Sequence, residues 1–284
     1  MIIAYLVVLG LCFGSFINAL NWRLHTQAAR REPAKRAKHD LTSAQLSMVK
    51  GRSMCSHCHH PLATKDLVPL FSWLWLRGKC RYCKHPIEDS PLIELALPLL
   101  FVASYVWWPY DFTAQGIFLL VCWLLALIAL MALLAYDLRW MLLPNKIVFP
   151  LIGLGVVQVL GQLLFFDAGS SYLVQVLLSV AVAGGIFYVL FQLSDGKWIG
   201  GGDVKLGYAL GLFIGSATQA CLMLFIASLL GIVAALPGML QHKLSVKSRI
   251  PFGPCLIVAT IIVILFGQSL LDGYWQALDS LYGV

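Results

Sequence analysis

The stretch QGIFLLVCWLLALIALMALLAY at residues 115–136 decides the fold, because it runs for 22 residues without a charge and stops at Asp137 in DLRWMLLPN (137–145). A helix needs about 20 apolar residues to cross a hydrocarbon core, so the stretch predicts a transmembrane helix. A second aspartate, Asp203, follows three glycines in GGGDVKL (200–206) at another apolar boundary. Carboxylates at the edge of a membrane span are costly to place, so both are hypotheses for a functional site.

The composition extends this interpretation to the whole chain. Of its 284 residues, 60% are hydrophobic and 12% are charged, and the mean hydropathy is +0.83. Such values exclude an ordinary soluble domain. We therefore expect an all-α polytopic membrane protein with about eight transmembrane helices, at about 1–22, 91–109, 115–136, 147–166, 172–192, 203–215, 217–238 and 254–271.

Lys and Arg residues give this layout an orientation. Residues 23–90 hold 13 of the 20, against five acids, and with eight spans the other seven fall on the same face. Basic loops stay in the cytoplasm, so we expect a multi-pass protein of the cytoplasmic membrane with both termini outside and both aspartates at the cytoplasmic face. The first apolar run lacks a positive start and a small-residue cleavage site, so it predicts a retained anchor.

We expect three parts: a first transmembrane helix (1–22), a basic cytoplasmic lobe (23–90) and a helical bundle (91–284). The lobe begins with a polar, basic segment (25–50), for which we expect a mobile or helical surface conformation. Its charge predicts contact with anionic membrane lipid. We expect no nucleic-acid partner, because no base-reading motif accompanies the charge. The sequence does not set an oligomeric state.

The lobe also contains two C-x-x-C pairs, Cys55 with Cys58 and Cys80 with Cys83. Two such pairs can supply four thiolates to one tetrahedral ion, so they predict a structural zinc site in a small zinc-ribbon-like lobe. Iron in the same sulfur site, and a disulfide or redox relay, are the alternatives. Any of four nearby histidines could also replace a cysteine ligand: His57, His59, His60 and His85.

Two neighbouring carboxylates favour a state in which one is ionised and one is protonated. The ionised group can then activate water while the other donates a proton to a peptide carbonyl. The three glycines would allow an extended substrate strand to come close to Asp203. The alternatives are a helix cap at Asp203 and a pairing of either acid with Lys205 or Arg139. Glu94, in PLIELALPLL, either lines a site or bonds to a neighbouring helix.

Taken together, these motifs resemble those of bacterial type IV prepilin peptidases, over nearly the whole chain and in the same order. The resemblance rests on GSFINALNWRL (14–24), C-x-x-C (55–58), PLFSWLWLRGKCRYC (69–83), PLIELALPLLF (91–101), DLRWMLLPN (137–145), GGGDVKLG (200–207) and PFGP (251–254). The combination of a double C-x-x-C with two aspartate motifs is specific, although no single piece would decide alone.

The resemblance implies a G-x-G-D aspartyl endopeptidase that removes the basic leader of prepilins or pseudopilins at the cytoplasmic face. Asp137 and Asp203 match the catalytic pair, and Gly200, Gly201, Gly202 and Lys205 belong to the loop around the second aspartate. Many members also methylate the new N-terminus with S-adenosylmethionine, an activity associated with the N-terminal half. The cofactor residues stay unknown, and Glu94 is the one acid we single out for them.

Three other functions fit parts of the sequence. A membrane thiol or metal protein would depend on the C-x-x-C pairs and not on the aspartates. A membrane methyltransferase without peptidase activity would modify only a pre-cut peptide. An intramembrane protease of presenilin type would cut within a span, but the aspartates lie at the depth of the membrane surface and argue against this.

Overall fold

A computed structural model describes residues 1–30, 46–47, 51–87, 91–240 and 251–282. The part of the basic segment at 31–45 and 48–50 lies outside these residues. The chain divides into two compact units, Met1–Ala103 and Ser104–Val284. Each unit is helical, and strand pairing among the described residues is limited to two isolated bridges in the lobe.

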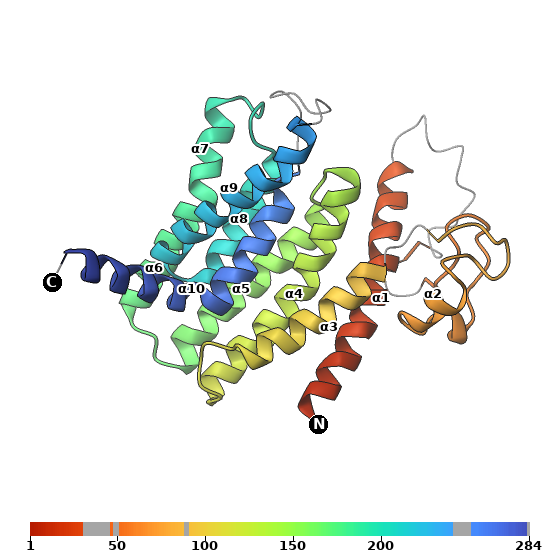
Figure 1. Cartoon of the computed structure of the whole chain (residues 1–284), viewed down its shortest axis with the longest axis horizontal. Coiled ribbons are helices and arrows are strands. Elements are labelled where there is room, and N and C mark those ends of the chain that lie inside the picture. The colour runs from red at the N-terminus through yellow and green to blue at the C-terminus, as the bar shows by residue number, and fades with distance from the viewer. Residues whose placement is uncertain (31–45, 48–50, 88–90, 241–250, 283–284) are drawn as a thin grey trace. The chain divides into compact units, whose positions relative to one another are not determined.

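The first unit contains one long apolar helix, most of a shorter one and the lobe (Figure 1). Helix α1 spans Ile2–Ala29, so it runs past the expected end at residue 22. Helix α3 spans Pro91–Val106 and begins the second apolar segment. They meet where Gly14 approaches Glu94: a Cβ on this glycine would lie 2.7 Å from the Glu94 Cα. Small residues four apart, here Gly10 and Gly14, permit such close approach of membrane helices.

Arg23 connects the end of α1 to the lobe. It is buried, and its guanidinium donates to the backbone oxygens of Ser47 and Gly51 at 3.2 and 2.8 Å. The lobe itself contains a short 3₁₀ helix, η2 (Thr64–Asp66), and helix α2 (Phe71–Trp75). Because a lobe of this size buries little apolar surface, we expect such anchoring and the predicted metal site to supply much of its stability.

The second unit is a helical bundle (Figure 1). Helices that are consecutive in the chain pack against each other, and so do helices that are distant in the chain. Helix α6 continues through a π-helical turn, η3, into α7. The bounds are α4 (Ala114–Trp140), α5 (Asn145–Phe165), α6 (Ser170–Val180), η3 (Ala181–Gly185), α7 (Ile186–Leu193), α8 (Gly201–Ile214), α9 (Ala217–Leu240) and α10 (Gly253–Tyr282).

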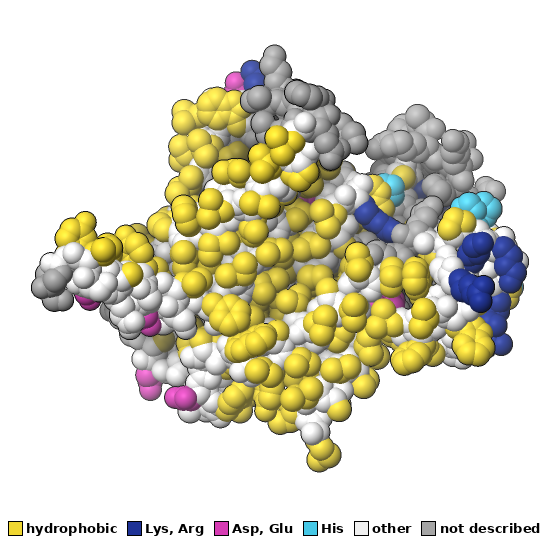
Figure 2. All heavy atoms as spheres, in the orientation of Figure 1, with side chains coloured by type: hydrophobic (Ala, Val, Ile, Leu, Met, Phe, Trp, Pro, Cys, Tyr) yellow, Lys and Arg dark blue, Asp and Glu magenta, His cyan; other side chains and the backbone are white. Residues whose placement is uncertain are grey.

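All eight expected spans are helical. Six of the described helices are long and apolar enough to cross a membrane: α1, α4, α5, α6 to α7, α9 and α10. The other two, α3 and α8, have 16 and 14 residues. Figure 2 shows hydrophobic side chains across the outer face of the helices. Side chains that face lipid need not be polar, which explains this surface.

Helix α8 is enclosed by its neighbours, which explains why so short a helix is stable. Leu206 and Leu210 are fully buried, and α8 contacts α5, α6, η3, α7, α9 and α10. Gly207 and Gly211 bring it against the backbone of η3 and α6: a Cβ at Gly211 would lie 2.7 Å from the Val180 Cα. Ser179 donates to the Gly211 carbonyl at 2.9 Å. This packing fixes the start of α8, where Asp203 lies.

Candidate functional site

The structure brings the two aspartates together at one end of the bundle. Asp137 lies in the last turn of α4, which continues to Trp140 and ends at Met141 in a left-handed conformation. The turn into α5 is therefore shorter than the seven residues expected after Asp137. Asp203 lies in the first turn of α8. Asp137 is buried and Asp203 is half-buried, and the two carboxylates interact electrostatically.

Gly253, the first residue of α10, lies between the two acids. A Cβ built on it would be 2.6 Å from Asp137 Oδ2 and 3.7 Å from Asp203 Oδ1. Because both oxygens lie so close to one point, the two carboxylates are near each other. The Gly253 N–H also donates to the Asp137 carboxylate. Phe252 anchors this turn, with its ring 6.0 Å from that of Phe187 on α7. Only glycine leaves room for both carboxylates here.

Gly253 is a site residue that our sequence reasoning did not single out. The PFGP motif quoted above was a signal, because a glycine between two prolines and next to an aromatic ring fixes a tight helix start. Its role depends on distant residues, so the motif alone does not reveal it.

The glycines before Asp203 have neighbours within the protein. A Cβ on Gly202 would lie 3.1 Å from Leu143, in the turn between α4 and α5. Gly200 is the N-cap of α8, and its N–H donates to the Asp203 carboxylate. An acidic side chain that accepts a hydrogen bond from the N-cap N–H three residues earlier forms half of a capping box. Asp203 therefore makes the helix-capping contact that the sequence offered as an alternative.

The described hydrogen-bond partner of Lys205 is an asparagine and not an aspartate. Its Nζ donates to Asn145 Oδ1 at 3.0 Å and lies 5.7 Å from the centre of the Phe149 ring. Asn145 is the first residue of α5, so this contact connects the start of α5 to the start of α8. Lys205 therefore belongs to the framework of the aspartate site.

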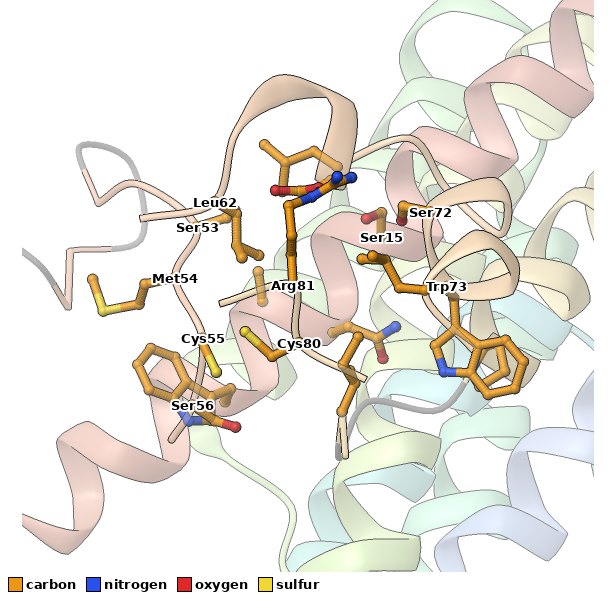
Figure 3. A pocket seen from close by; sticks show the side chains of 18 of the residues that line it. Ser15, Ser53, Met54, Cys55, Ser56, Leu62, Ser72, Trp73, Cys80 and Arg81 are labelled. Carbon is orange, nitrogen blue, oxygen red and sulfur yellow. The ribbon is translucent and has the colours of Figure 1, made fainter. Parts of the chain in front are cut away.

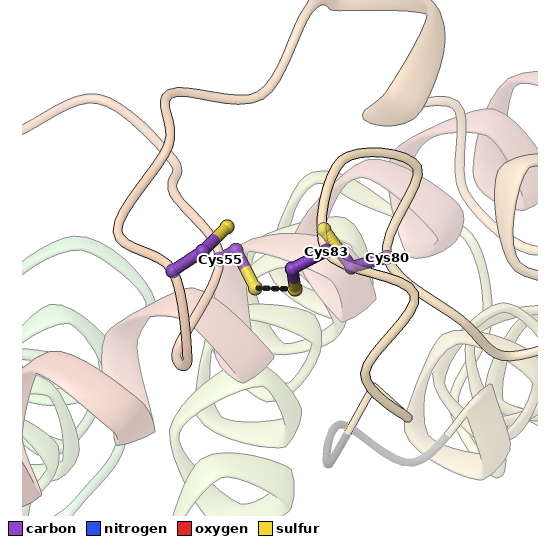
Figure 4. A group of neighbouring side chains, drawn as sticks. Cys55, Cys80 and Cys83 are labelled. Carbon is purple, nitrogen blue, oxygen red and sulfur yellow. Dashed lines mark hydrogen bonds between the residues drawn. The ribbon is translucent and has the colours of Figure 1, made fainter.

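In the first unit, the four cysteines form a cluster whose sulfur atoms all lie within 4.8 Å of one another. Figure 4 shows Cys55 and Cys83 with their sulfurs facing each other, 3.8 Å apart. Sulfur atoms placed tetrahedrally at about 2.3 Å from a zinc ion lie roughly 3.8 Å from one another. The cluster therefore fits one tetrahedral metal ion, and no disulfide joins these four residues.

The two C-x-x-C turns share one geometry. The N–H of Cys55 donates to the His60 carbonyl at 3.1 Å, and the N–H of Cys80 donates to the His85 carbonyl at 2.8 Å. The residue after each second cysteine, His59 or Lys84, has a φ near +60°. Burial alone would raise the pKa of Cys80, but backbone N–H groups of its own turn and the neighbouring thiols lower it to about 7. A thiol of this kind is readily available as a thiolate ligand.

The nearby histidines do not join the cluster. His57 stacks on His85 with ring centres 4.0 Å apart, and His60 lies 3.9 Å from Tyr82. Both contacts cross from one C-x-x-C turn to the other, so these rings hold the turns together. The described residues thus favour four sulfur ligands, as expected, over any set that includes histidine.

The Glu94 carboxylate forms its hydrogen bond with the lobe and not with a neighbouring helix. Its Oε2 accepts the Leu70 N–H at 2.8 Å, and Leu70 has a φ of +60°. A leucine in this left-handed region is strained, so the hydrogen bond to Glu94 helps to hold the start of α2. Glu94 also lines a cavity within the first unit.

Comparisons with known proteins now place the chain. Residues 8–108 match the bacterial peptidase A24 N-terminal domain, and residues 118–236 match the type IV leader peptidase family. The prepilin leader peptidase/N-methyltransferase of Dickeya chrysanthemi is 35% identical, covering 89% of each chain. Those of Stutzerimonas stutzeri and Pseudomonas aeruginosa are each 32% identical, covering 95% of this chain and 92% of theirs.

No solved structure matches the chain. The two family matches and the identity over nearly the full length agree with the order of motifs in the sequence, and they do not favour the thiol protein or the presenilin-type protease. The chain belongs to the type IV leader peptidase family.

Proposed function

We propose that this chain is an aspartic endopeptidase that removes the basic leader from type IV prepilins or pseudopilins and then methylates the new N-terminus. The observation that carries the peptidase is the convergence of Asp137, Asp203 and Gly253 from three helices. The ionised aspartate takes a proton from water, the resulting hydroxide attacks the scissile carbonyl, and the protonated aspartate donates to its oxygen. Collapse of the tetrahedral intermediate then breaks the C–N bond: the first aspartate gives its proton to the departing amine nitrogen, and the second takes a proton back from a hydroxyl as the carboxylic acid forms.

The bundle, residues 91–284, carries this chemistry in our proposal, and the first helix (1–22) anchors the lobe. The chain is an inner-membrane protein of several spans, and the basic residues beside both aspartates support a site at the cytoplasmic face. Arg139, Lys146, Lys197 and Lys205 all lie near the helix ends that carry Asp137 and Asp203. The leader is cationic and would be cut where its charged part meets the apolar part of the substrate.

The lobe, residues 23–90, would hold a structural Zn²⁺ through Cys55, Cys58, Cys80 and Cys83. The similar turns and the sulfur separations support this choice. Exposed basic side chains on the same lobe, Lys65, Arg77, Lys79 and Lys84, suit contact with anionic lipid (Figure 2). S-adenosylmethionine would supply an electrophilic methyl group to the neutral N-terminal amine, which loses a proton as S-adenosylhomocysteine leaves.

The test uses the full chain in lipid with a prepilin, with and without S-adenosylmethionine, and reads the products by intact mass spectrometry. We expect a cut at the charged–apolar boundary and, with the methyl donor, an added mass of one methyl group. A cut inside the apolar segment would instead indicate intramembrane proteolysis. Methylation of a pre-cut peptide without cleavage of the precursor would leave only the methyltransferase.

A further inference from the structure

Helix α2 of the lobe carries a cluster of apolar side chains that the described part of the first unit leaves exposed. Phe71, Leu74 and Trp75 are 70%, 70% and 84% exposed, and Val68, just before the helix, is 45% exposed. We call these four residues the α2 patch. Exposed apolar patches mark contacts with a membrane or with another protein. We propose that the α2 patch is buried in the hydrocarbon layer of the membrane. The lobe then enters the bilayer, which goes beyond the surface contact with anionic lipid proposed above.

The contact between α1 and α3 gives the depth of the patch. The apolar run of α1 ends at Trp22, and Arg23 is the first charged side chain of the sequence, so we place the membrane surface there. Gly14, nine residues before Arg23, contacts Glu94 on α3. At a rise of 1.5 Å per residue, this contact lies about 13 Å below the surface along the helix axis. The Glu94 carboxylate accepts the Leu70 N–H at 2.8 Å, so the residue before α2 is held close to that depth.

The length of α3 gives a second measure of depth. This helix runs antiparallel to α1, because Glu94 meets Gly14 and Pro98 meets Gly10. Its 16 residues span about 24 Å, whereas a hydrocarbon core is about 30 Å thick. Two tryptophans, at 107–108, follow its far end and are typical of a membrane surface. Helix α3 therefore begins inside the core, and any tilt shortens its reach further. The part of the lobe bonded to its first turn begins there as well.

The gap between α1 and the lobe explains how polar groups are accommodated at this depth. Ser15 and Asn18 of α1 line the gap together with Ser72 and Trp73 of α2, and Figure 3 shows Ser15 and Ser72 on one side of it. Polar side chains within a span need partners inside the protein, and the lobe covers this face of α1. The three helical residues of the α2 patch have the spacing i, i+3 and i+4 of one helix face, so they point away from this gap.

Basic side chains surround the α2 patch and favour a membrane over a second copy of the chain. Lys65, Arg77 and Lys79 are exposed, and Figure 2 shows Lys and Arg side chains gathered on the lobe beside hydrophobic ones. Long cationic side chains keep their stems in hydrocarbon and their charges among lipid phosphates. An apolar patch with aromatic residues and a basic rim is typical of a segment that lies in the membrane interface. In a symmetric pair of chains, the two basic rims would meet and repel each other.

The test places a photoreactive benzophenone amino acid in the full chain, in nanodiscs of phosphatidylethanolamine and phosphatidylglycerol. It replaces Trp75 in one protein and, in two reference proteins, the exposed residues Phe16 and Ala28 of α1. These lie six residues on either side of Trp22, so they are about 9 Å below and above the surface. Acyl-chain adducts are counted by mass spectrometry after ester hydrolysis. We expect the adduct at position 75 to be within twofold of that at 16 and at least fivefold above that at 28. An adduct no larger than that at 28 would overturn the proposal.

Salt separates insertion from attraction at the surface. At 1 M salt the screening length is about 3 Å, so a contact made by basic side chains alone is lost. We expect the adduct at position 75 to change less than twofold between 0.05 and 1 M salt, concentrations chosen on the same ground. A loss of fivefold or more would assign the lobe to the membrane surface and overturn the insertion.

Carboxylates on the patch should expel it from the hydrocarbon. With the benzophenone in place of Phe71, Leu74→Glu combined with Trp75→Glu should lower the acyl adduct at least fivefold, whereas the control Lys79→Glu should lower it less than twofold. Equal adducts in the two variants would contradict insertion, and an adduct to a second chain in place of lipid would assign the patch to a protein interface. These measurements need no prepilin and no methyl donor, so their outcome is separate from that of the proposed activities.

Discussion

The cysteine cluster and the aspartate site are assembled in different ways. The four cysteines lie within residues 55–83, and each pair is shaped by hydrogen bonds between residues that are close neighbours in the chain. Asp137, Asp203 and Gly253 come from three helices that are distant in the sequence and meet only because the bundle packs. A local cluster depends on its ligand for order, whereas the aspartates depend on helix packing. Damage to one site should therefore leave much of the other intact.

The largest effect is expected from Asp137→Asn and Asp203→Asn. Each change removes one of the two carboxyl groups that exchange protons with water and the peptide in the proposed mechanism, so cleavage should fall by about 10³-fold or more. Methyl transfer to a pre-cut peptide should persist, since the family resemblance associates that reaction with the N-terminal half. Intact mass spectrometry reads both reactions, and helical content by circular dichroism checks the fold. Normal cleavage by either folded variant would refute the aspartyl mechanism.

Gly253→Ala tests the packing of the aspartate site without altering a carboxylate. The added methyl group would lie 2.6 Å from Asp137 Oδ2, so one of the two must move. Displacement of a reacting group by about 1 Å can lower a rate roughly 10²-fold, and we expect cleavage to fall by 10- to 100-fold on this ground.

Gly273→Ala is the matched control, because it lies on the same helix with no atom within 4 Å of the added Cβ. Its cleavage rate should match that of the wild type. Equal rates for the two glycine variants would show that Gly253 does not set the position of the aspartates.

Removal of the metal tests the cysteine cluster, the local site of the two. Cys80→Ser replaces a buried ligand, and we expect bound zinc to drop from one ion per chain to near zero by elemental analysis. The lobe should become sensitive to protease, and methyl transfer should fall about tenfold because a small lobe depends on its metal for order. Cleavage of a prepilin should change less than methyl transfer. A larger loss in cleavage than in methylation would contradict the separation of the two sites.

The same contrast explains what could be predicted from the sequence. The apolar runs and the position of the Lys and Arg residues predicted eight helical segments, because length and charge alone decide them. The cysteine cluster was predictable from spacing, since its geometry is local. The convergence on Gly253 was not, because it depends on how Gly207 and Gly211 dock α8 and on where α10 begins. The hydrogen bonds of Glu94 and Lys205 likewise depend on tertiary packing. Glu94 lines a cavity, as one alternative had it, but bonds to Leu70 in the lobe and not to a neighbouring helix, and Lys205 bonds to Asn145 and not to an aspartate.

The smallest effect is expected at Lys205, and it sharpens the distinction between a catalytic group and its framework. Lys205→Met removes the hydrogen bond to Asn145 and keeps an apolar stem over Phe149. An exposed hydrogen bond of this kind contributes about 0.5–1.5 kcal/mol, which corresponds to roughly a two- to tenfold loss in cleavage if it acts only by positioning α8. Asn145→Ala removes the same bond from the other side. If the two changes act through one contact, the double variant should be no worse than the more damaging single variant, and additive losses would give Lys205 a separate role in binding the substrate.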